Sequence, residues 1–296
     1  MRLRLPLRLE VKPRRAAAVL HEMQPRRALL AATFTALALV ALTFGKQLVR
    51  MVPTASADEA LPPGATVPVL VELFTSEGCS SCPPAEDELS RLESAQPIPG
   101  VRVVPVGFHV DYWNNLGWTD PFSTAAWTER QREYAQAGSR GTGLYTPEAV
   151  VQGGRDCVGS DDSALRSLVR QAAALPAAHV VLTRSTATSA PNEVRVSVNV
   201  TSLPAGTPGD QAELRLVLVE RGVVVDVPRG ENGGKRLHHV AVARDLAMVG
   251  RVSGGGGTSE GTLTVPPASR RDALGVIAVV QERLSRRVLG VGTLDL

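Results

Sequence analysis

Cysteine is scarce in this sequence. Three cysteines occur in 296 residues, and two of them, Cys79 and Cys82, belong to one Cys-X-X-Cys motif. Small secreted domains that depend on disulfides carry several pairs of cysteines, so the sequence is not a disulfide-rich scaffold. With 44% hydrophobic residues, the chain can instead build the apolar core of one large or two ordinary domains.

Lysine is nearly absent beyond residue 57, and the net charge of that part of the chain is negative. Lys235 is the only lysine in residues 58–296, where 22 Lys/Arg stand against 27 Asp/Glu. The sequence pI of about 9.0 therefore comes from residues 1–57, which hold ten Lys/Arg and two Asp/Glu. Because the folded part lacks a basic excess, we expect it to have no nucleic-acid partner.

Residues 1–57 are predicted to be a signal peptide or an N-terminal anchor. The apolar run Ala28–Phe44 follows Arg26-Arg27, and Ala55-Ser56-Ala57 suits a cleavage site. The segment before the arginines is long for a signal peptide, which suggests Met23 as the start of translation. An uncleaved anchor is the alternative. Both interpretations make the rest of the chain extracytoplasmic, whether periplasmic, secreted or membrane-anchored facing outward, where disulfides can form.

The Cys79/Cys82 motif lies where a predicted strand passes into a predicted helix. Val67–Phe74 is an apolar run typical of a buried strand, and a helix is expected from about Cys79 to Leu92. Cysteines in this position form a redox signature, and the free N–H groups of a helix start would stabilise a Cys79 thiolate. Cys79 is then the nucleophile and Cys82 the resolving thiol. Because Pro83 and Pro84 follow Cys82, the alternative is a helix that begins at Pro84, which would weaken this stabilisation of the thiolate. A structural disulfide and half of a zinc site are the alternatives.

A cluster of polar and aromatic residues follows the second predicted strand, Val101–Phe108. Strand, helix and strand of this length form a βαβ unit, whose two parallel strands end at the same edge of the sheet. His109 and Asp111 are therefore candidate proton carriers, and Tyr112 and Trp113 are candidate substrate-facing rings. A histidine that only packs against the strand end is the alternative for His109.

The chain then continues through a helix, a hairpin and a second helix. The aromatic residues of Thr124–Ala137 have helical spacing, and Asp161–Ala174 is amphipathic. Between them, Glu148–Gln152 and Arg155–Val158 are predicted strands joined by a glycine turn. Cys157 in the return strand is expected to be a small buried side chain, with a third redox thiol or a metal ligand as the alternative.

From His179 onward, strand patterns replace helical ones. Apolar and polar residues alternate strictly in Glu193–Ser202, and several further short apolar stretches have the length of strands. A small antiparallel β-sandwich is the architecture that this pattern favours. We therefore predict an α/β domain at residues 58–177 and an all-β sandwich at residues 178–296.

The β-rich half offers little chemistry. Residues 229–234 form a polar, glycine-rich loop that we expect to be a surface turn, with contact to the redox site or to a partner as the alternative. His238-His239 begins the next strand. Neighbouring residues of a strand point to opposite faces, so the two histidines are not expected to share one metal ion. Binding or scaffolding is the expected role of this half.

The order of elements in the first half resembles the thioredoxin fold, an α/β fold whose mixed sheet here carries one inserted helix. In that fold the Cys-X-X-Cys motif follows the first strand, and a cis proline before the third strand packs against the disulfide. The resemblance implies that Pro147 is the cis proline and that the Thr146 backbone binds an extended substrate chain. It also implies that Glu72, although one residue further from the motif than the family's acid, takes the proton of Cys82.

A more specific resemblance is to a bacterial secreted family, domain of unknown function 1223, which is grouped with thioredoxin-like proteins. The resemblance implies a fold and a redox motif, without naming a substrate. It is carried by five segments: Glu72–Pro84, Phe108–Trp113, Leu116–Trp118, Tyr145–Pro147 and Arg229–Asn232.

Together these features predict an extracytoplasmic thiol–disulfide oxidoreductase that works through Cys79 and Cys82. Its partners would be protein thiols or disulfides and a redox partner protein, with a membrane involved only if the leader is uncleaved. No cofactor beyond the redox-active disulfide is expected. One alternative is a copper or other metal carrier using both cysteines and His109, since soft thiolates select Cu(I). Another is a non-enzymatic secreted binding module with a structural disulfide.

Overall fold

The computed structural model describes residues 66–138, 143–187 and 189–296. The predicted leader, its cleavage site and the proposed start at Met23 lie outside these residues. Within the described ranges, no helix combines the length and the apolar character needed to cross a membrane.

The described chain alternates helices and strands in its first half and is almost entirely strands in its second half. The first half contains β1 (Val67–Thr75), α2 (Pro83–Ala95), β2 (Val101–His109), α3 (Ala125–Ala137), β3 (Glu148–Val151), β4 (Arg155–Val158) and α4 (Asp162–Ala173). The second half contains β5 (His179–Arg184), β6 (Glu193–Thr201), β7 (Ala212–Asp226), β8 (Arg236–Val252), β9 (Gly256–Thr264), a short 3₁₀ helix (Arg271–Ala273), β10 (Leu274–Glu282) and β11 (Val288–Asp295).

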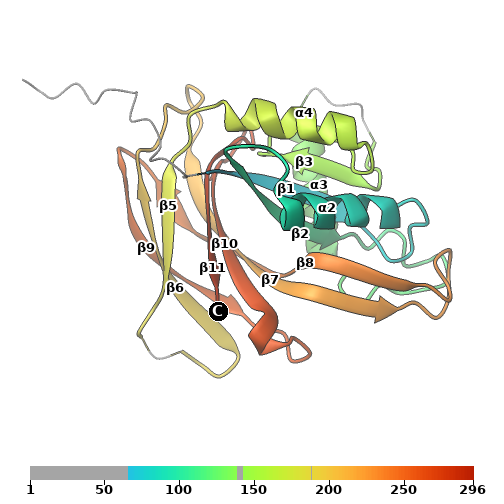
Figure 1. Cartoon of the computed structure of the whole chain (residues 1–296). Helices are drawn as coiled ribbons and strands as arrows, with labels where there is room; N and C mark the ends of the chain where they lie inside the picture. The colour runs from blue at the N-terminus through green and yellow to red at the C-terminus, as the bar shows by residue number, and fades with distance from the viewer. Residues whose placement is uncertain (1–65, 139–142, 188) are drawn as a thin grey trace, which may run out of the picture. The chain divides into compact units, whose positions relative to one another are not determined.

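Eight of these strands form one mixed sheet in the order β11-β10-β7-β8-β2-β1-β3-β4, and β5, β6 and β9 form a second, antiparallel sheet (Figure 1). The predicted βαβ unit is confirmed, because β1 and β2 pair in parallel along their whole length. The predicted hairpin is confirmed as well, since β3 and β4 are antiparallel neighbours.

The predicted fold class is wrong. We expected a thioredoxin-like α/β domain followed by a separate β-sandwich, but β7, β8, β10 and β11 extend the same sheet that contains β1 to β4. The described structure is therefore mostly β. The junction is the outer edge of β2, where Gly107 pairs with Val242 of β8. An open strand edge offers unpaired N–H and C=O groups, and here a strand from the second half lies along that edge and pairs with it at Gly107. The division at residues 177/178 into folding units stays a prediction.

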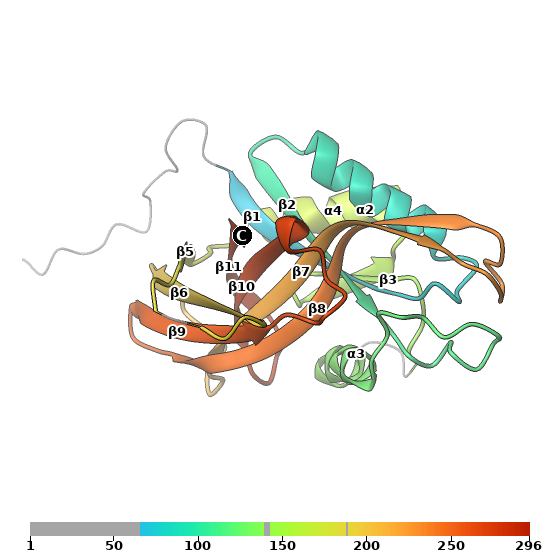
Figure 2. The ribbon, with the colours of Figure 1, turned by 90° about the horizontal axis from the view of Figure 1, so that it is seen from below.

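The large sheet carries helices on both faces in its first half (Figure 2). Neighbouring residues of β1 point to opposite faces. Val71 and Leu73 pack with α2 and α4, whereas Leu70 and Phe74 pack with Trp127 and Tyr134 of α3. A third core lies between the three-stranded sheet and the inner face of β7 and β10. The α2 face and the α3 face thus have separate cores, and the Cys-X-X-Cys motif precedes α2.

Glu282, at the end of β10, provides a test of acid stability. Its buried carboxylate accepts hydrogen bonds from Arg287 Nη2 at 3.0 Å and Thr207 Oγ1 at 2.8 Å. Burial alone would raise the pKa of Glu282, but the hydrogen bonds from Arg287, Ser285 and Thr207 outweigh it and lower the pKa to about 2. A pKa that is lower in the folded state stabilises the protein above the unfolded value of about 4.5, and this stabilisation is lost as pH falls toward 2.

We therefore expect the melting temperature of the wild type to decrease as the pH is lowered from 4.5 to 2. We also expect Glu282→Gln to lower the free energy of unfolding at pH 7 by about 1–3 kcal/mol. Circular dichroism melts of both proteins across this range measure the effect. The wild type should lose more stability on acidification than the variant. Equal losses in the two proteins would contradict the assignment.

Candidate functional site

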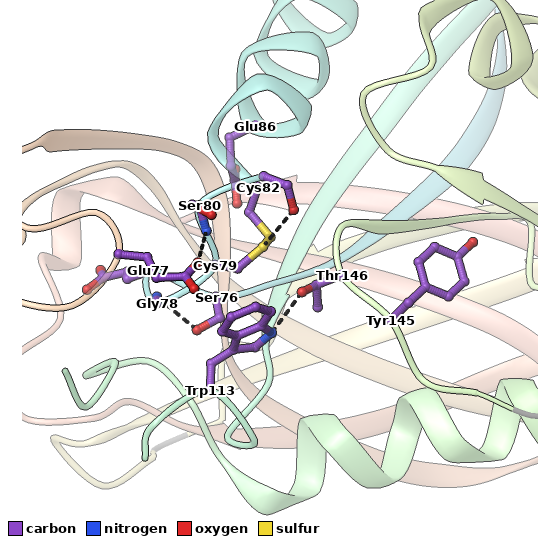
Figure 3. The surroundings of a disulfide bond; sticks show 12 residues. Ser76, Glu77, Gly78, Cys79, Ser80, Cys82, Glu86, Trp113, Tyr145 and Thr146 are labelled. Carbon is purple, nitrogen blue, oxygen red and sulfur yellow. Dashed lines mark hydrogen bonds between the residues drawn. A yellow bond between two sulfur atoms is a disulfide. The ribbon is translucent and has the colours of Figure 1, made fainter. Parts of the chain in front are cut away.

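A disulfide joins Cys79 and Cys82 in the loop between β1 and α2 (Figure 3). The Cα atoms are 5.4 Å apart, and the two residues are 0% and 1% exposed, whereas Ser80 and Ser81 between them are exposed. The disulfide is therefore covered by protein, and the surface of the motif is formed by the two serines.

Helix α2 begins at Pro83, one turn later than the expected start at Cys79 and one residue before the alternative start at Pro84. Cys82 is its N-cap residue, and Pro83 and Pro84 occupy the first two positions, where an N–H would have no partner in the helix. Residues 79–82 instead form a turn in which the Cys82 N–H bonds to the Cys79 carbonyl at 3.2 Å. Because Cys79 precedes the helix and prolines supply no N–H groups, a helix start gives little support to a Cys79 thiolate.

The loop at residues 229–234 is an exposed turn apart from Asn232, as expected, and it also contacts the motif, which was the alternative for it. Asn232 is completely buried, and its Nδ2 donates hydrogen bonds to the carbonyl oxygens of Glu77 and Cys79, both at 2.9 Å. The Glu231 carboxylate accepts a hydrogen bond from the Ser80 N–H at 3.1 Å. The second half of the chain thereby holds the disulfide loop in place. The resemblance of Arg229–Asn232 to the family was the one signal in the sequence for this contact.

Trp113 and Thr146 are among the residues around the disulfide (Figure 3). The indole N–H of Trp113 donates to Thr146 Oγ1 at 2.8 Å, and the Thr146–Pro147 peptide bond is cis. The backbone of Gly78 lies against Trp113, since a Cβ at Gly78 would be 3.2 Å from Trp113 Cβ. The structure thus brings together the candidate ring, the candidate substrate-binding threonine and the cis proline loop.

Asp111 and Tyr112 are instead bound to α3. The Thr128 hydroxyl donates to Asp111 Oδ1 at 2.6 Å, and the Tyr112 hydroxyl donates to Gln131 Oε1 at 3.3 Å. Burial raises the pKa of Tyr112 to about 12. Tyr112 is still 37% exposed, so it is accessible to a substrate, whereas the contacts of Asp111 hold the loop against α3. Their predicted roles stay predictions.

His109 lies in a buried polar cluster that sequence analysis did not anticipate. Its Nδ1 is 2.7 Å from Asp120 Oδ2, and its ring centroid is 4.8 Å from that of His239 in β8. His239 Nδ1 in turn is 3.3 Å from Glu86 Oε1 in α2. Glu77 completes the cluster, because its N–H donates to Asp120 Oδ2 at 2.9 Å.

The histidines and carboxylates of this cluster shift one another's pKa values. Burial opposes ionisation of His239, but the Glu86 and Glu77 carboxylates outweigh it and raise its pKa to about 10. Burial likewise opposes ionisation of Glu86 and Asp120, yet the neighbouring histidines keep the pKa of both carboxyl groups below the usual value. No local pattern connects Glu77, Glu86, Asp120 and His239, so only the fold brings them together.

Glu72 lies on the α3 side of the sheet in a buried ion pair. Arg130 Nε donates to Glu72 Oε1 at 2.7 Å, and the Tyr134 hydroxyl bonds to the other carboxylate oxygen. The guanidinium therefore compensates this carboxylate. These contacts give Glu72 a structural role, and its predicted service as the proton acceptor of Cys82 stays a prediction.

Cys157 is a half-buried free thiol in β4 that packs against the core formed with α2 and α4. Burial, followed by the nearby carboxylates of Asp161 and Asp156, raises its pKa to about 11. The thiol is therefore protonated at neutral pH and a poor nucleophile. The groups of potential metal ligands found among the described residues contain no cysteine.

Most of the chain matches the model of one protein family. The model of a family described as protein of unknown function (DUF1223) matches residues 70–281. The chain belongs to the DUF1223 family. This match runs from β1 to β10, so the family unit includes the Cys-X-X-Cys motif, the loop at residues 229–234 and both halves of the large sheet.

Solved structures place this DUF1223 protein beside two others of similar fold. The crystal structure of a protein from Agrobacterium tumefaciens is 28% identical, covers 78% of this chain and 95% of its own, and has a TM-score of 0.56. HBP35 of Porphyromonas gingivalis is 12% identical, covers 78% and 76%, and has a TM-score of 0.55, which shows similarity of fold alone.

A domain of the outer membrane lipoprotein Omp28, also from Porphyromonas gingivalis, matches 41% of this chain and 89% of its own at 14% identity. Its TM-score of 0.27 supports no conclusion about the DUF1223 protein. No curated protein matches the chain.

Proposed function

We propose that this DUF1223 protein is an extracytoplasmic thiol–disulfide oxidoreductase that works through Cys79 and Cys82. The observation that carries the proposal is the closed disulfide at the end of β1, beside a pocket of about 370 Å³ whose wall includes Cys82. Trp113, Thr146 and the exposed Tyr112 are the candidate substrate-facing groups. The extracytoplasmic location rests on the sequence of residues 1–57.

The proposed reaction exchanges one disulfide for another. In the reducing direction, the Cys79 thiolate attacks a substrate disulfide and forms a mixed disulfide, while the other substrate sulfur leaves as a thiolate and takes up a proton. Cys82 then loses its proton, attacks Cys79 and releases the second substrate thiol. Two electrons pass from the Cys79/Cys82 pair to the substrate, and the intramolecular disulfide forms. The oxidising direction is the reverse.

A structural disulfide in a binding module is the second candidate, and the burial of both cysteines favours it. Side chains that are 0% and 1% exposed must become accessible before a protein substrate can react with them. The metal-carrier alternative with Cys79, Cys82 and His109 draws no comparable support, because cysteines joined in a disulfide offer no thiolate ligands.

The reduction potential of the Cys79/Cys82 pair separates the two candidates. The purified protein, carrying Cys157→Ala to remove the third thiol, would be equilibrated in glutathione buffers and its free thiols trapped. We expect a potential between about −120 and −270 mV, the span of catalytic dithiols. A potential below about −300 mV would identify a structural disulfide and contradict the enzyme proposal.

A further inference from the structure

Three buried side chains from distant parts of the chain meet beside the disulfide loop. Glu86 comes from the first turns of α2, His109 from the end of β2 and His239 from β8, and they are 5%, 1% and 4% exposed. Each offers one potential ligand atom, and these atoms lie within 4.8 Å of one another. The set combines two imidazoles and one carboxylate.

The atoms at the centre of this group lack hydrogen-bond partners. Glu86 Oε1, His109 Nε2 and both ring nitrogens of His239 are buried and make no hydrogen bond to any described group. The 3.3 Å contact of His239 Nδ1 with Glu86 Oε1 falls short of hydrogen-bond geometry. A buried polar atom without a partner costs about 1–3 kcal/mol, so several at one point call for an explanation.

His109 is oriented as a metal-ligating histidine usually is. In metal sites, the ring nitrogen that does not face the ion usually donates to a carboxylate, which holds the ring in position. Here His109 Nδ1 is 2.7 Å from Asp120 Oδ2, whereas His239 Nε2 lies 3.8 Å from Glu77 Oε1, beyond hydrogen-bond distance. The opposite nitrogens, His109 Nε2 and His239 Nδ1, belong to the group that includes Glu86.

The second carboxylates are themselves held by neighbouring groups. Trp118 Nε1 donates to Glu77 Oε2 at 2.8 Å, and the Phe122 N–H donates to Asp120 Oδ1 at 2.9 Å. The orientation of the His109 ring is therefore maintained by a second layer of contacts. Three carboxylates against two imidazoles also leave the cluster with excess negative charge, which a divalent cation would compensate.

Space and access are present at the same point. At Gly107 in β2, a Cβ would lie 3.9 Å from Glu86 Oε1 and 4.0 Å from His109 Nε2, so the glycine leaves the region between them free of a side chain. Glu86 and His239 also line the pocket of about 370 Å³ that borders Cys82. An ion could enter through this pocket without the disulfide being opened.

We propose that Glu86, His109 and His239 bind a divalent transition-metal ion, for which Zn²⁺ is the probe. Two histidines and one glutamate form a donor set suited to zinc at bond lengths of about 2.0–2.2 Å, with further positions left for water. The site is independent of the dithiol chemistry, because none of its ligands is a cysteine. It also differs from a copper carrier built on the motif.

The test measures Zn²⁺ binding to the purified full chain after EDTA treatment, with the disulfide closed and Cys157→Ala present so that no thiolate contributes. Equilibrium dialysis with elemental analysis should give one Zn²⁺ per chain, and the thermal midpoint should rise with Zn²⁺ concentration. His239→Ala and Glu86→Gln should each weaken binding by more than about 10-fold. His179→Ala is the control, because His179 in β5 is exposed, does not line this pocket and should leave binding unchanged.

Two results would overturn the site. Equal binding by His239→Ala and His179→Ala would place the ion elsewhere, and absence of stoichiometric Zn²⁺ in the wild type would leave a simple buried ion pair between Glu86 and His239. If His239→Ala fails to fold by circular dichroism, Glu86→Gln decides, because it keeps the shape of the side chain and removes its charge. Loss of the Zn²⁺-dependent rise in thermal midpoint in this variant supports the site, and an unchanged rise overturns it.

Discussion

Replacing Cys79 by serine is expected to reduce dithiol–disulfide exchange to the uncatalysed rate. A serine hydroxyl is not ionised at neutral pH and cannot form a mixed disulfide, so the first step of the exchange is lost. The measurement is the rate at which the purified protein reduces, or oxidises, a disulfide-containing test protein in a glutathione buffer. Cys82→Ser should instead accumulate a mixed disulfide on Cys79, visible on a non-reducing gel.

Cys157→Ser is the control for this experiment. Its thiol is held protonated by a pKa of about 11 and is separate from the Cys79–Cys82 disulfide, so we expect the exchange rate to stay within about twofold of the wild type. Full activity of Cys79→Ser would exclude the proposed mechanism. A mixed disulfide trapped on Cys82 in that variant would show that Cys82 is the nucleophile and Cys79 the resolving thiol. This outcome is worth testing because Cys82 lines the pocket.

Replacing Arg130 by leucine is expected to lower the free energy of unfolding by about 3–5 kcal/mol. Glu72 and Arg130 are 1% and 4% exposed, and Arg130 Nη2 is 2.6 Å from Glu72 Oε1. Removing the guanidinium leaves the Glu72 carboxylate buried without a compensating charge, which is the costly part of breaking a buried ion pair. Urea unfolding followed by circular dichroism measures the change.

The double variant Glu72→Leu/Arg130→Leu is the control, because removing both charges leaves no unpaired ion. Its stability should recover most of the loss. It also tests the predicted proton transfer from Cys82 to Glu72. If the folded double variant keeps the wild-type dependence of exchange rate on pH, Glu72 is structural; a shifted profile would support its role as the proton acceptor. A loss below about 1 kcal/mol in Arg130→Leu would contradict the ion-pair argument.

Local elements of the first half are predictable because their signals are local. Apolar runs mark β1 and β2, and the strand predicted at Arg155–Val158 has the bounds of β4. Thr124, predicted at the start of a helix, is the N-cap of α3, where its side chain accepts the Trp127 N–H. The expected start of α2 at Cys79 is wrong, whereas the alternative start at Pro84 differs by one residue from the observed start at Pro83. Two successive prolines are tolerated at the first helical positions, where an N–H would have no partner in the helix.

Long strands are harder to predict than short ones. β7 covers Ala212–Asp226 as one strand, whereas the apolar pattern favours two shorter strands because Gly222 interrupts it. β8 extends over 17 residues from Arg236 to Val252, of which the sequence indicates only the beginning. Both strands lie in the middle of the large sheet, so pairing with neighbours on each side stabilises stretches whose own pattern is weak.

The sequence by itself determined the pair of cysteines, the strand before them, the helix after them and membership in a family with this motif. Only the tertiary structure decided what surrounds the pair. Asn232, 153 residues further along the chain than Cys79, and His239 reach the motif because β8 pairs with the open edge of β2. Which strand completes such an edge depends on long-range packing and backbone pairing, and no local periodicity encodes it.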